Sequence, residues 1–240
     1  MDRFPEGPPA AAIVPGDDTA AARALRVQML ATEHWSLLAT RSLSWNESFA
    51  RASMFLTLLS GATVALALVA QATAFGQGFV LFALLILPVV LFIGLATYVR
   101  LLEINNEDYV WVLGMNRLRA AYLEIDPALA KYLVTGSTED AEGIFLTYGS
   151  LPGTQSNLDT GLFHGFVTTP TTIAFVDAML AAVLAAIVSV QVNMAMGSAS
   201  GIGILVFFVT FGALGYFGFR SQVMAHLTVA RPPSSKEGSA

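Results

Sequence analysis

The chain has 240 residues, of which 55% are apolar and only 12% are charged, about half the charged share of an ordinary soluble domain. This composition argues against a soluble fold of this size, because large apolar areas would remain in water. The net charge of −5 argues against a nucleic-acid partner, and the absence of cysteine excludes disulfides and thiolate metal sites.

Residues 1–18 predict a disordered N-terminal tail, because they hold several acids and prolines and no apolar run of signal-peptide type. Asp17 or Asp18 is placed to cap an amphipathic helix over residues 19–52. Its side chains at near-helical spacing are Val27, Leu30, His34, Leu38, Trp45 and Phe49. We expect this helix to continue into the first membrane span and to pack on other cytoplasmic helices. The alternative is a helix that lies on the membrane surface.

Four segments are apolar and long enough to cross a hydrocarbon core of ~30 Å as helices that rise ~1.5 Å per residue. The spans cover residues 54–75, 79–102, 172–194 and 201–219. Short links pair them into two antiparallel transmembrane hairpins, over residues 53–102 and 171–219. The sequence therefore predicts an all-α polytopic membrane protein with four transmembrane helices and a helical cytoplasmic extension.

All twelve Lys and Arg residues lie outside the two hairpin tips. Cytoplasmic flanks of membrane spans carry the excess of positive charge. We therefore expect both termini, the connector over residues 103–170 and the tail over residues 220–240 to be cytoplasmic. The preference for Arg over Lys, with abundant Ala, Leu, Val and Gly, is typical of a high-GC bacterial genome, so we expect the membrane to be a bacterial inner membrane.

The connector begins as a continuation of the second span, because good helix formers persist as far as Asp126. One face of this helix carries Leu102, Tyr109, Leu113, Asn116, Ala120 and Leu123. Asp126 then resembles an N-cap and Pro127 a first helical residue, which predicts a short helix through Val134. Residues 135–170 are rich in glycine and are expected to be mostly loop, with a possible strand over residues 144–148.

No constellation of catalytic type is present in the sequence. His34, His164 and His226 are far apart and lack metal-ligand spacing, and there is no phosphate-binding loop. The glycine-rich run over residues 197–203 follows a membrane span and is interpreted as a turn. We therefore expect a protein that is not an enzyme and that has no cofactor and no metal.

The candidate pathway residues among the polar groups of the spans are Asp177, Thr57 and Gln71. Ionisable groups inside a membrane often belong to ion or proton pathways. Asp177 is a candidate for such a pathway. The alternative is a structural anion that pairs with one of the arginines at the same membrane face, which are Arg51, Arg100 and Arg220.

Small residues at helical spacing predict close helix contacts, since packing drives helix association in lipid. The first span carries Thr57, Gly61, Val64, Leu68 and Gln71 at alternating steps of four and three. The candidate packing residues are Gly61, Ala178, Ala181, Ala185, Gly212 and Gly215. These faces are interpreted either as contacts within one bundle or as a subunit interface or pore lining.

Four helices enclose little lumen, so a conduction path would form on an oligomer axis. The sequence therefore favours a homo-oligomeric pore or channel-like protein for ion transport, with a cytoplasmic helical regulatory part. The alternative is a non-conducting scaffold or regulator that binds a protein partner through its cytoplasmic helices. In either case the lipid bilayer and a second copy of the chain are expected partners.

Overall fold

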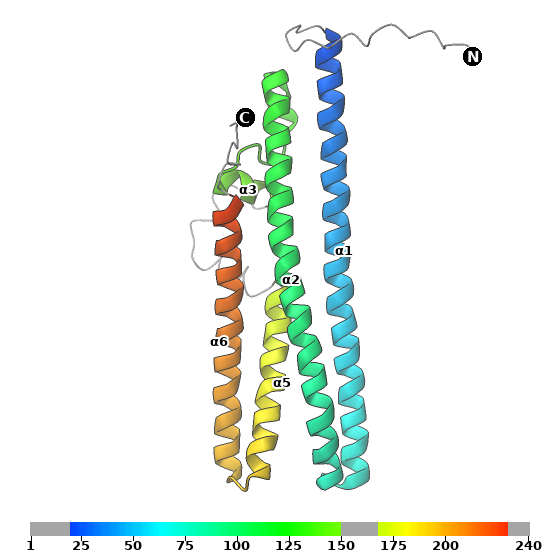
Figure 1. Ribbon diagram of the computed structural model, residues 1–240, viewed down its shortest axis with the longest axis vertical. Coiled ribbons are helices and arrows are strands. Elements are labelled where there is room, and N and C mark those ends of the chain that lie inside the picture. The colour runs from blue at the N-terminus through cyan, green and yellow to red at the C-terminus, as the bar shows by residue number, and fades with distance from the viewer. Residues whose placement is uncertain (1–19, 150–167, 230–240) are drawn as a thin grey trace, which may run out of the picture.

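A computed structural model of the chain describes residues 20–149 and 168–229. The described elements are α1 (Ala20–Thr73), α2 (Gln77–Ile125), the 3-10 helix η1 (Pro127–Tyr132), α3 (Ala141–Thr147), α5 (Thr169–Gln191) and α6 (Met196–Val229). Four of them, α1, α2, α5 and α6, are long and apolar enough to cross a membrane. They pack as two pairs, α1 with α2 and α5 with α6, which confirms the predicted fold class (Figure 1).

Each pair is closed by a tight turn that reverses the chain. Ala74 and Phe75 take positive φ angles of 46° and 56° in the first turn, and Asn193 takes 63° in the second. Asparagine tolerates this left-handed conformation better than most residues. Both turns lie at the same end of the molecule, at the bottom of Figure 1.

The first pair is much longer than a membrane is thick. At ~1.5 Å per residue, the 54 residues of α1 extend about 80 Å and the 49 residues of α2 about 74 Å. A hydrocarbon core takes up ~30 Å of either. The rest forms a paired helical extension, here called the stalk, from α1 residues 20–53 and α2 residues 103–125. The predicted continuity of the first helix with the first span is confirmed, because α1 is unbroken.

The predicted apolar stripe of the first helix is mostly wrong. Its members Val27, Leu38, Trp45 and Phe49 are exposed. The face turned to α2 instead carries half-buried positions, which are Leu30, His34, Leu37 and Arg41. Polar contacts with α2 decide this orientation, so apolar spacing alone could not reveal it. The predicted face of α2 is confirmed, because all six of its residues are buried or half-buried.

The four long helices form an open arrangement and do not close into a ring. Within the described ranges, α2 contacts α1, α5 and α6, whereas α1 and α6 do not touch each other. The core lies where α1, α2 and α5 meet, around Phe55, Val90, Leu101 and Ile173. The other described helices therefore leave a broad side of α1 uncovered.

The connector contains two short helices and no strand among its described residues, so the suggested strand is wrong. Asp126 caps η1, since its carboxylate accepts a hydrogen bond of 2.9 Å from Ala128 N, as predicted. Asp140 caps α3 by accepting a hydrogen bond of 2.9 Å from Gly143 N. This cap begins a helix that turns Ile144 and Thr147 inward, which a short apolar run does not distinguish from a strand.

Candidate functional site

Asp177 is the buried acid of the membrane-spanning region. It is the ninth residue of α5, its exposed fraction is 0%, and neither carboxylate oxygen has a hydrogen-bond partner. Gly94 of α2 faces it so closely that a Cβ at Gly94 would overlap Asp177 Oδ1 and lie 2.9 Å from Phe55 Cε2. Three helices therefore enclose one unpartnered carboxyl group.

The expected ion pair between Asp177 and Arg51, Arg100 or Arg220 is wrong. Arg51 Nε lies 2.7 Å from Glu47 Oε1, and Arg100 Nε lies 3.0 Å from the same oxygen. Arg220 is exposed on α6. Arg51 and Arg100 both pair with Glu47 at the end of the apolar segments. Asp177 lies about 9 Å further into the membrane-spanning region than Arg100, at ~1.5 Å per residue.

These arginines belong to a cluster of charges where α1 and α2 enter the stalk. Arg100 also contacts Glu103 and Glu107, through Nη1, at 3.0 and 3.1 Å. Hydrogen bonds from Arg100 and then Arg51 lower the pKa of Glu47 to about 2. The side chains are between 29% and 57% exposed, so water screens the charges and the cluster adds little stability. Its position marks the end of the apolar part of both helices.

A more buried ion pair joins the two helices of the stalk. Arg41 Nε donates to Asp108 Oδ1 at 2.7 Å, and Arg41 Nη2 donates to Asp108 Oδ2 at 3.3 Å. Trp45 Nε1 donates to the same carboxylate at 3.2 Å. The Arg41 guanidinium also lies over the Tyr148 ring, 5.4 Å from its centroid, and burial raises the pKa of the Tyr148 hydroxyl.

A second buried polar cluster ties the connector to α2. Asn116 Nδ2 donates to Thr138 O at 2.7 Å, and Thr147 Oγ1 donates to Asn116 Oδ1 at 2.7 Å. Arg119 Nη1 donates to that oxygen at 2.9 Å. Burial, and then the charge of Arg41, lowers the pKa of Arg119. These bonds therefore fasten the connector and α3 to the α2 half of the stalk.

The candidate stripe on the first span faces away from the other helices of the chain. Thr57, Gly61, Val64, Leu68 and Gln71 are all exposed. The most polar line of this outward side follows steps of four and three residues along Ser53, Thr57, Ser60, Val64, Ala67 and Gln71, here called the outer stripe. The hydroxyls of Thr57 and Ser60 each donate to the carbonyl four residues earlier, at 2.8 Å.

The other small residues divide between two roles. Ala178 is fully buried, and Ala181 and Ala185 are half-buried. An added Cβ at Gly61, Gly212 or Gly215 would meet no atom within 4 Å. The alanines of α5 therefore pack against other helices of the chain, whereas the candidate glycines of α1 and α6 lie on open faces.

Other close contacts were not singled out from the sequence. A Cβ at Gly203 would lie 3.1 Å from Ala182 O, which brings α5 and α6 together. Tyr98 donates a hydrogen bond of 2.6 Å to Leu214 O and so joins α2 to α6. The partners are 116 residues apart, and no local pattern predicts such a pairing.

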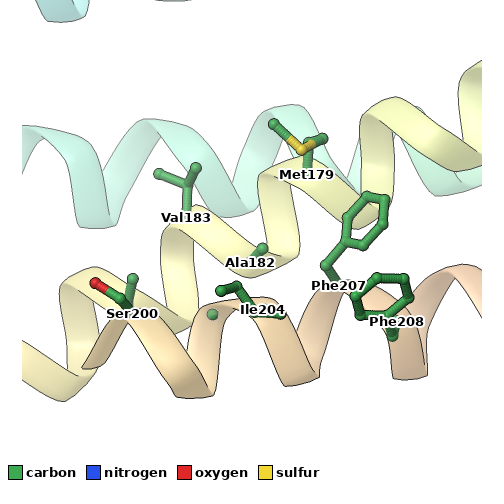
Figure 2. A pocket seen from close by; sticks show the side chains of 9 residues that line it. Met179, Ala182, Val183, Ser200, Ile204, Phe207 and Phe208 are labelled. Atoms are coloured by element: carbon green, nitrogen blue, oxygen red, sulfur yellow. The ribbon is translucent and has the colours of Figure 1, made fainter. Parts of the chain in front are cut away.

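An apolar groove with a volume of about 360 Å³ lies between α5 and α6. Figure 2 shows Met179 and Val183 on α5 opposite Phe207 and Phe208 on α6. Ser200 supplies a hydroxyl, but this group donates to Met196 O at 3.0 Å. The groove offers an apolar surface for hydrocarbon chains and no group for chemistry.

The described residues hold no group of three or more His, Asp or Glu side chains that is suited to a metal ion. His34 stacks on Tyr122 with a ring-centroid distance of 6.0 Å, while His164 and the side chain of His226 lie outside the described part. Comparisons with protein-family models, curated proteins and solved structures found no match.

Proposed function

We propose that the protein is a homo-oligomeric pore or channel-like protein of a bacterial inner membrane, with α1 at the oligomer axis. The observation that supports this proposal most strongly is the outward orientation of the outer stripe. In this arrangement Thr57 and Gln71 line the path. The protein is not an enzyme, and it requires no cofactor.

Two features of the fold support self-association through α1. The protomer leaves this side of α1 uncovered because α6 does not reach it. Steps of four and three residues are the spacing at which neighbouring helices interlock over many turns. The small members of the stripe, such as Ser53, Ser60 and Ala67, allow close approach, and close packing stabilises helix contacts in lipid.

The stalk supplies the regulatory part of the proposal. Both α1 and α2 run unbroken from the membrane region into the stalk, where Asp108 and Arg41 join them. A rotation of the stalk pair would therefore be transmitted along α1 to the outer stripe.

Substitution of Ala67 by leucine tests the oligomer. Ala67 is an exposed member of the outer stripe, and Ala96 is an equally small, exposed residue on α2. Lipid accommodates a larger side chain, whereas a tight helix contact does not. We expect Ala67→Leu to shift the mass distribution of the complex in nanodiscs, measured by mass photometry, and Ala96→Leu to leave it unchanged. A strictly monomeric wild-type protein at every protein-to-lipid ratio would overturn the proposal.

Ion flux into liposomes tests conduction separately from assembly. Thr57→Val and Gln71→Met are expected to reduce flux while the oligomer persists, because each removes a polar group from the path with little change in side-chain size. An oligomer that gives no flux above protein-free liposomes would overturn the pore proposal and favour the scaffold or regulator.

The scaffold or regulator is the second candidate, and the exposed apolar side chains of the stalk favour it. Leu25, Met29, Trp35 and Leu43 are between 54% and 74% exposed. Exposed apolar surface outside a membrane often marks a protein interface. A photo-crosslinker at Trp35 should then capture one defined protein in native membranes, whereas a crosslinker at the exposed Glu124 should not.

Cysteine labelling tests the proposed orientation, in which the hairpin tips face away from the cytoplasm. The chain has no native cysteine, so single substitutions report unambiguously. Gln77→Cys and Ser198→Cys, at exposed tip positions, are expected to react with an impermeant thiol reagent in intact cells. Val134→Cys, 92% exposed beside the stalk, should react only after the membrane is opened. Labelling of Val134→Cys in intact cells would contradict this topology.

A further inference from the structure

We propose that Asp177 is a proton-binding site: the packed helices hold it as the neutral carboxylic acid, and α2 and α5 must separate at Gly94 before it can ionise. The proposal follows from the enclosure of its carboxyl group and does not depend on the pore.

The surroundings of Asp177 oppose a negative charge. Its two oxygens are buried and accept no hydrogen bond. An ionised carboxylate without donors or a counter-ion is strongly disfavoured away from water, so the group retains its proton. Asp177 is the ninth residue of α5, whereas the stabilising field of a helix N-terminus fades within the first turn.

The charged groups on the neighbouring helices do not compensate. On α1, Arg51 is the nearest titratable residue, and it is paired with Glu47. On α2, Arg100 is bonded to Glu47, and the Tyr98 hydroxyl donates to Leu214 O.

The remaining two elements add no counter-ion. The helix α5 has no second titratable residue. The titratable groups of α6 among residues 196–225, Tyr216 and Arg220, are exposed. Asp177 thus lacks a counter-ion on every described element packed around it.

Gly94 connects the protonation of Asp177 to the packing of the helices. The space that a side chain at Gly94 would need is filled by Asp177 Oδ1. Water therefore has no room to solvate a carboxylate unless α2 and α5 move apart. Pro88, six residues away inside α2, lacks the amide hydrogen of a regular helix and so weakens the helix locally.

Linkage gives the direction and size of the effect. The closed arrangement binds the proton more tightly than an open, hydrated one. In the pH range where the open form is ionised and the closed form is still protonated, each unit of rising pH should therefore reduce the ratio of closed to open protein about tenfold. Asp177 lies nearer the stalk than the hairpin tips, so the shorter route to water leads to the stalk side.

The test combines two measurements on the full chain in liposomes. Infrared spectra are expected to contain the carbonyl band of a protonated carboxyl group at neutral pH, where exposed acids are ionised. Aspartate labelled with ¹³C in its side chain should shift this band. As pH rises, the band should disappear while amide hydrogen exchange increases in α2 and α5 around Gly94 and Asp177.

Variants assign the signal to one residue. Asp177→Asn, a neutral side chain of similar shape, should abolish the band and make hydrogen exchange independent of pH. Glu103→Gln, which changes an exposed acid, should alter neither readout. A wild-type protein without the protonated aspartate band would overturn the proposal, as would pH-dependent exchange that persists in Asp177→Asn. The wild-type spectrum decides even where the Asn variant does not fold.

Discussion

Gly94→Val is expected to lower the free energy of unfolding by about 3 kcal/mol, because overfilling a packed core forces side chains and backbone to shift. The new side chain would overlap Asp177 Oδ1 and crowd Phe55, whose exposed fraction is 1%. Unfolding by denaturant titration in mixed micelles measures the loss.

Gly61→Val is the matched control, since an added Cβ at this position of the neighbouring span meets nothing within 4 Å. It should leave the unfolding of the isolated protomer nearly unchanged. A double-mutant cycle of Gly94→Ala with Asp177→Ala should show that the double variant loses less free energy of unfolding than the sum of the two single variants. Equal losses for the Gly94 and Gly61 variants would mean that the three-helix contact is not packed as described.

Asp108→Ala is expected to destabilise the stalk by about 3 kcal/mol, because removal of one partner leaves a partly buried charge uncompensated. The Arg41 and Asp108 side chains are 20% and 7% exposed, and Trp45 Nε1 also loses its acceptor. Amide hydrogen exchange should rise in α1 around Arg41 and in α2 around Asp108, with little change near the hairpin tips.

An exposed ion pair provides the comparison for this stalk variant. Arg117 Nε and Glu139 Oε1 lie 2.7 Å apart, but the two side chains are 53% and 52% exposed. Glu139→Ala should therefore cost about 0–1 kcal/mol. A similar loss in both variants would show that burial does not distinguish the two pairs.

The helix α2 carries both Gly94, which packs on the proposed proton site Asp177, and Asp108, the acid of the stalk pair. Gly94 and Asp108 are both on α2, about 21 Å apart at ~1.5 Å per residue. Separation of α2 from α5 at Asp177 would therefore tilt a helix whose other end is fastened to α1. This connection gives the proposed proton site a mechanical route to the stalk.

Local features of the sequence determined the four apolar helices and their hairpin pairing. A segment that crosses a bilayer must satisfy its backbone hydrogen bonds internally, so an apolar run of about 20 residues can cross only as a helix. The links after Thr73 and Gln191 are short enough to impose the antiparallel direction. Likewise Asp126 and Pro127 predicted η1, because a cap and a first-turn proline act within a few residues.

The tertiary structure alone decided which faces of those helices meet. In membrane spans nearly every face is apolar, so periodicity does not distinguish the side that meets α5 from the side that meets lipid. The pairing of Arg41 with Asp108, which are 67 residues apart, turned Phe49 outward against the predicted stripe and left Trp45 half-exposed beside the pair. The contact of Gly94 with Asp177 left a buried carboxyl group where the sequence suggested an ion pair. Both outcomes depend on how whole helices lie against one another, and the free energy of that arrangement is shared among contacts remote in the chain.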